Sequence, residues 1–106
     1  MGVRRILVAN ELTSYRQSIA IVFRELHPNL EVLEIHPDTL DLEVARGGPD
    51  LVVCSRLTTV VEELAANWIE LYPDCRPFST FCIGGERTAM EEVQLSDLLL
   101  ACARVL

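Results

Sequence analysis

Three pairs of residues that could contact a ligand stand directly after apolar runs of the sequence. They are Asn10–Glu11, Ser55–Arg56 and Gly84–Gly85. In open α/β sheets, ligands bind in the crevice at the carboxyl ends of the strands. An amide, a carboxylate, a hydroxyl and a guanidinium at that edge could form a polar pocket, or they could serve only to cap helices. These residue types by themselves name no reaction.

A thiol and a guanidinium lie on either side of the two glycines. In phosphatase loops a Cys thiolate attacks phosphorus while an Arg and backbone amides hold the oxyanions, and the segment from Cys82 to Thr88 resembles such a loop. Four residues separate Cys82 from Arg87, one fewer than in that family, and no helix signal follows. We therefore interpret the segment as a buried strand cysteine followed by a glycine turn.

The strands that must position these residues are predicted from the spacing of apolar side chains. Continuous apolar runs predict buried strands at 5–10 and 50–54, whereas alternation in 30–35 predicts a more exposed strand. A fourth strand is predicted at 78–83. The segment 88–95 is predicted to be a short fifth strand or an extended segment.

Helices are predicted where apolar residues recur at helical spacing after a capping residue. Capping-box patterns begin at Ser14 and Thr59, and Pro73 would close the helix that carries Trp68. The predicted helices are 14–26, 38–47, 59–72 and 96–106. Strands that alternate with helices indicate a parallel sheet with right-handed crossovers.

The expected fold is a single α/β domain, 1–106, with three layers around an open parallel sheet. The first and third predicted strands are the most apolar, so we expect them at the centre, with the second strand at an edge. The resulting order, 2-1-3-4-(5), is that of flavodoxin-like folds. The domain is shortened between the fourth strand and the last helix, because 83–95 is too short for a further helix as well as a strand.

The chain resembles the receiver domain of response regulators, the CheY-like family, along most of its length. The similar segments are 5–11, 15–18, 49–55 and 95–104. The resemblance implies phosphorylation of an Asp after the third strand, with an acidic pair for magnesium, a Thr or Ser, and a Lys. Here the acceptor position falls on Ser55 or Cys54, and the acidic pair on Asn10–Glu11. The Thr or Ser position falls near Gly84–Gly85, and no Lys follows.

The receiver-like order without these groups predicts a pseudo-receiver: a signalling or scaffold module that is not phosphorylated, is no enzyme and acts through protein contacts. The alternative is a small-ligand-binding protein or small enzyme that uses a strand-end pocket around Asn10, Ser55 and Cys82. A concave, ligand-sized pocket at the strand ends would favour the alternative, and a filled or flat surface would favour the module.

Composition limits which partners, compartment and bound groups are expected for the chain. The net charge of −7 argues against nucleic acid, because an acidic surface repels phosphates. The apolar runs are too short for a membrane helix, and without a secretory signal we expect the cytoplasm. The cysteines lack zinc-site spacing, so we expect no metal or cofactor and four reduced thiols. They are Cys54, Cys75, Cys82 and Cys102.

A homodimer is also predicted. Four predicted helices leave one face near the fourth strand, or the edge beyond it, without cover. The apolar side chains expected there are those of Phe78, Phe81, Met90 and Val93. A symmetric pair of chains is the commonest way to bury such a surface.

Overall fold

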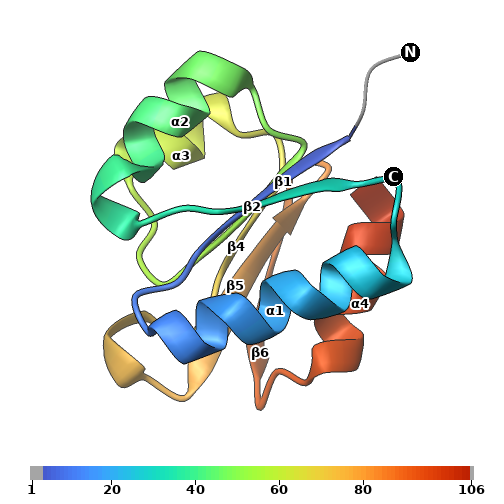
Figure 1. Cartoon of the computed structure of the whole chain (residues 1–106). Coiled ribbons are helices and arrows are strands. Elements are labelled where there is room, and N and C mark those ends of the chain that lie inside the picture. The colour runs from blue at the N-terminus through green and yellow to red at the C-terminus, as the bar shows by residue number, and fades with distance from the viewer. Residues whose placement is uncertain (1–3, 106) are drawn as a thin grey trace.

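The computed structural model describes residues 4–105, apart from the side chain of Cys75. Over this range six strands form one mixed sheet, with four α-helices and two short 3-10 helices (Figure 1). The strands are β1 (Arg5–Ala9), β2 (Glu31–Glu34), β3 (Leu51–Cys54), β4 (Trp68–Glu70), β5 (Phe78–Ile83) and β6 (Glu86–Glu91). The α-helices are α1 (Thr13–Leu26), α2 (Leu40–Gly47), α3 (Thr59–Leu64) and α4 (Leu95–Val105). The 3-10 helices are η1 (Pro37–Thr39) and η2 (Pro73–Cys75).

The strand order is β2-β1-β3-β4-β5-β6. The first four strands run parallel, and Val53 of β3 pairs with Val8 of β1 on one side and with Ile69 of β4 on the other. As predicted, β1 lies between β2 and β3. The prediction of a wholly parallel sheet is wrong, because β5 is antiparallel to β4 and β6 is antiparallel to β5.

The predicted helix 59–72 ends early. It stops at Leu64, and Trp68–Glu70 instead forms β4 against β3. Trp68 is buried in the core, as expected, but from a strand. Trp68 packs on one face of the sheet while Ile69 and Leu71 pack in the core of the other face. The buried edge of β3 needs partners for its backbone groups, and β4 supplies them.

The predicted fourth strand is β5, and the uncertain segment that follows is β6, which begins two residues before the expected 88–95. Gly84 and Gly85 form the two-residue turn of this hairpin, with φ of 62° and 83°. Both central residues of a type I′ turn need a positive φ, which glycine adopts without a steric cost. The hairpin therefore follows directly from the glycine pair.

The predicted three layers are present. Alternate side chains of each parallel strand enter different cores, as in β1, where Ile6 and Val8 face one core and Leu7 and Ala9 face the other. Helices α1 and α4 cover the first core, and α2 and α3 cover the second (Figure 1). Phe81, predicted on an uncovered face, is instead buried in the first core.

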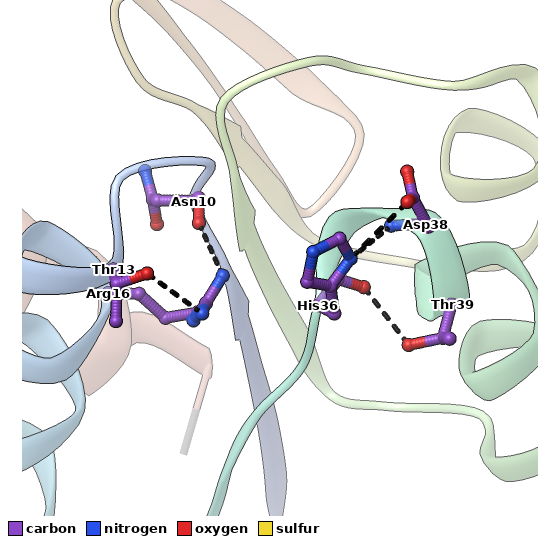
Figure 2. A network of polar contacts seen from close by, with 6 residues as sticks. All are labelled: Asn10, Thr13, Arg16, His36, Asp38 and Thr39. Atoms are coloured by element: carbon purple, nitrogen blue, oxygen red, sulfur yellow. Dashed lines mark hydrogen bonds and ion pairs between the residues drawn. The ribbon is translucent and has the colours of Figure 1, made fainter.

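Helix α1 begins without a side-chain cap. Its N-cap residue is Leu12, so the capping box predicted from Ser14 is wrong. Elsewhere His36 accepts a hydrogen bond from the backbone N–H of Asp38 at 3.1 Å and so caps η1 (Figure 2). Over residues 4–105, no helix is long and apolar enough to cross a membrane.

Candidate functional site

Four of the predicted site residues lie together at the carboxyl ends of β1 and β3. The Ser55 hydroxyl accepts a hydrogen bond from the backbone N–H of Glu11 at 2.8 Å. The Arg56 guanidinium forms an ion pair with the Glu11 carboxylate at 3.4 Å. Asn10 is buried beside them. The parallel direction of β1 and β3 brings these residues to one edge of the sheet.

Gly84 and Gly85 do not belong to this group. Because β5 runs antiparallel to β4, the turn after β5 lies at the opposite edge of the sheet. The N–H of Gly84 there donates to the side-chain oxygen of Asn67, the residue before β4, at 2.8 Å. Cys82 pairs with Trp68 at the start of β4, so it also lies away from the strand ends. The prediction that Gly84, Gly85 and Cys82 share the pocket is therefore wrong.

A cavity of about 190 Å³ opens at the strand ends. Its lining combines the four polar residues that follow β1 and β3 with five others that the sequence did not single out. The others are Leu12, Tyr15, Leu71, Tyr72 and Asp74. Leu71 and Tyr72 follow β4, and they were missed because that strand was predicted as part of a helix.

Asn10 carries the most unusual feature of the cavity. Its side chain is 0 % exposed, and within the described part of the chain neither amide atom has a hydrogen-bond partner. The backbone oxygen of Asn10, by contrast, accepts a hydrogen bond from Arg16 at 2.9 Å (Figure 2). Buried polar groups in native structures are almost always paired, so the free donor and acceptor need an explanation.

Two tyrosines, Tyr15 and Tyr72, line the cavity. The N–H of Tyr72 donates to the Ser79 hydroxyl at 2.9 Å, and the Tyr72 hydroxyl donates to the backbone oxygen of Val93 at 3.0 Å. Burial raises the pKa of Tyr15, with a further rise from Tyr72. Tyr72 and Asp74 have φ of 45° and 53°, a region that non-glycine residues rarely adopt and that clusters at functional sites.

The groups at this edge are suited to binding more than to nucleophilic chemistry. Burial, with a further contribution from Glu70, raises the pKa of Cys54 to about 12, so the thiol is protonated at neutral pH. The Ser55 hydroxyl is held by the N–H of Glu11. Among the residues that the structure describes, no three His, Cys, Asp or Glu side chains are grouped to hold a metal ion.

The segment that resembles a phosphatase loop has a different role. Cys82 and Arg87 are directly opposite each other in the hairpin, so no loop surrounds the thiol. The Arg87 guanidinium lies over the Trp68 ring, 5.1 Å from its centroid, and pairs with the carboxylate of Glu62. This contact covers Trp68 of the second core next to the turn of the hairpin.

No protein-family model, curated protein or solved structure matches the chain. The resemblance to receiver domains stays a prediction.

Proposed function

We propose that this domain binds a small molecule in the cavity at the ends of β1, β3 and β4. Asn10 belongs to the lining of the cavity, and the observation that carries the proposal is its buried amide, which lacks a partner for both its oxygen and its nitrogen within residues 4–105. A buried polar atom without a hydrogen bond costs about 1–3 kcal/mol. A ligand that pairs with both amide atoms would recover that cost.

The neighbouring polar residues support this interpretation. A side chain whose only role was to link the loops after the strands would form hydrogen bonds with groups of those loops. Ser55 does so with the N–H of Glu11, and the backbone oxygen of Asn10 does so with Arg16. The Asn10 amide makes neither kind of bond. The cavity is also concave, and its polar groups converge beside two leucines and two tyrosines, a combination that small-molecule sites use.

The experiment is a ligand-observed NMR screen of small polar fragments against the wild-type chain and Asn10→Leu. We expect fragments that bind the wild type and lose binding in the variant. Asn29→Leu is the matched control, because Asn29 is exposed in the loop between α1 and β2 and does not line the cavity. Fragments that bind all three chains equally, or none, would contradict the proposal.

A receiver-like module that acts through protein contacts, without phosphorylation, is the second candidate. Leu12 and Leu100 are 69 % and 66 % exposed, and β6 is an edge strand of the described sheet. Edge strands and exposed apolar side chains are common sites of partner contact. A homodimer stays a prediction of this candidate. Sedimentation at tens of micromolar that shows a monomer, together with no captured partner, would count against it.

A further inference from the structure

We infer that the ligand is an uncharged molecule with an amide-type head, which pairs with Asn10, and an apolar body, which lies over Tyr15 and Leu71 in the groove between α1 and α4. The inference rests on the proposed function. It goes further by assigning the chemical class of the ligand and the direction in which the ligand extends.

The amide-type head is inferred from the two side-chain atoms of Asn10 that have no hydrogen-bond partner in the described residues. Its nitrogen is a donor and its oxygen an acceptor, so the complementary group must offer an acceptor and a donor side by side. A carboxamide, a lactam or the edge of a nucleobase does so. A carboxylate offers only acceptors, and an ammonium offers only donors.

The charge of the cavity also disfavours an acid. Glu11 and Asp74 line it with one cation, Arg56, and that cation is already paired with Glu11. A carboxylate placed there would lose its hydration without gaining a free positive partner. An uncharged head avoids that cost.

The apolar body follows from a second cavity of about 160 Å³ that adjoins the first. Tyr15 and Leu71 line both cavities, so the two are neighbours that share these side chains. The lining of the groove is mainly apolar: Ile19, Val22, Val93, Leu95 and Leu98. A molecule longer than a single fragment would therefore find apolar surface in the direction of this groove.

The side chain of Asn10 is expected on the same side of the sheet as the groove. Side chains of β1 alternate, and Ile6 and Val8 face the core beneath α1 and α4. Asn10 continues that alternation on the side of Leu71, which belongs to the same core. Its amide is shielded from solvent, so a head that pairs with it requires a side chain of the cavity lining to change rotamer, a motion that exposed side chains such as Tyr15 make within nanoseconds.

The test uses a series of primary alkyl amides (butanamide, hexanamide and octanamide) and the carboxylates of the same lengths, titrated into the ¹⁵N-labelled full chain. We expect Kd for the amides to fall roughly fourfold for each added methylene, as burial of each methylene contributes its transfer free energy. Each carboxylate should bind at least about tenfold more weakly than its amide, because removing the donor leaves one Asn10 atom unpaired. Equal or tighter binding of the carboxylates would overturn the amide head.

Two variants of α1 separate the groove from the Asn10 cavity. Ser18 is exposed and lines the groove, so Ser18→Phe should block it and abolish the gain with chain length while butanamide still binds. Gln17→Phe places the same ring on the same helix outside both cavities and should change nothing. Amides that bind through Asn10 without any dependence on chain length would overturn the apolar body and leave the proposed function standing. Loss of the Asn10 dependence itself would overturn both.

Discussion

The parallel half of the sheet, β1 to β4, and the hairpin of β5 and β6 use their strands differently. In the parallel half every strand ends at the same edge, so the residues after β1, β3 and β4 meet and line one cavity. In the hairpin the chain turns back through Gly84 and Gly85, and its turn lies at the opposite edge. Strand direction therefore decides which half can build the site.

The two halves also differ in burial. Every residue of β3 is buried, whereas β6 has no buried residue and only Met90 of that strand is half-buried. Helices cover both faces of the parallel half, while next to the turn of the hairpin the α2–α3 side is covered by the contact of Arg87 with Trp68 and Glu62. The parallel half, together with the buried residues of β5, should thus dominate stability, and β6 should act mainly as cover.

The largest difference is expected from truncating one apolar side chain in each half. Ile69→Ala in β4 removes a fully buried side chain and should lower the free energy of unfolding by about 2–5 kcal/mol, through lost burial and the cavity that remains. Met90→Ala in β6 removes a half-buried side chain and should cost clearly less. Urea unfolding of both variants measures this, and equal losses would contradict the comparison.

The second expected effect is a rise in the free energy of unfolding instead of a loss. Asn10→Leu replaces an unpaired buried amide with an apolar group of similar size, so the free energy of unfolding should rise by about 1–3 kcal/mol. The same variant should lose fragment binding, which is the trade between stability and function expected at a binding site. Thermal and urea unfolding test the rise. A loss of stability on this substitution would mean that the amide is paired in the native protein.

Much of the parallel half could be predicted from the sequence because its signals are strong. The apolar runs of β1 and β3 and the helical spacing of α1 admit one interpretation each. Asn10, Glu11, Ser55 and Arg56 were identified because they directly follow those strands. Their convergence needs only that β1 and β3 be parallel neighbours, which their apolar character indicated.

The part of the fold and of the site that the sequence did not predict depends on β4, which has three residues. Trp68 and Leu71 continue the helical spacing of Val61 and Leu64, and so short a strand cannot be told from the end of a helix by periodicity. Without β4, the lining residues Tyr72 and Asp74 could not be placed at the cavity. The glycine pair was a hairpin signal, but an assumption of uniform parallel strands placed it at the wrong edge.

A smaller effect is expected from pH, and it again belongs to the parallel half. The pKa of Cys54 is raised by burial from 9.0 to about 12, so the folded chain holds this proton where the unfolded chain releases it. The contribution of Cys54 to the free energy of unfolding is fully present below pH 9. It falls as the pH rises towards 12, by at most about 1.4 kcal/mol per pH unit. All basic side chains other than histidine are arginines, so no lysine titrates in this window.

Cys54→Ala should flatten this alkaline slope. The comparison is between the two slopes from pH 8 to 10, measured by urea unfolding, because the substitution also changes packing. Groups that titrate in both chains cancel. Slopes that are the same in the variant and the wild type would show that the Cys54 thiol does not carry the effect.

The smallest expected effect tests how the hairpin covers the core. Trp68 is the only tryptophan in the chain, so tryptophan fluorescence reports on the surroundings of this one side chain. Arg87→Ala removes the guanidinium from the indole face, admits water, and should shift the emission to longer wavelength with little change in overall stability. Glu62→Gln is the control, because it removes the charge of the ion pair and leaves Arg87 in place. If the emission stays unchanged in Arg87→Ala, the second core is closed by its apolar side chains alone, with Cys82 as the contribution of the hairpin.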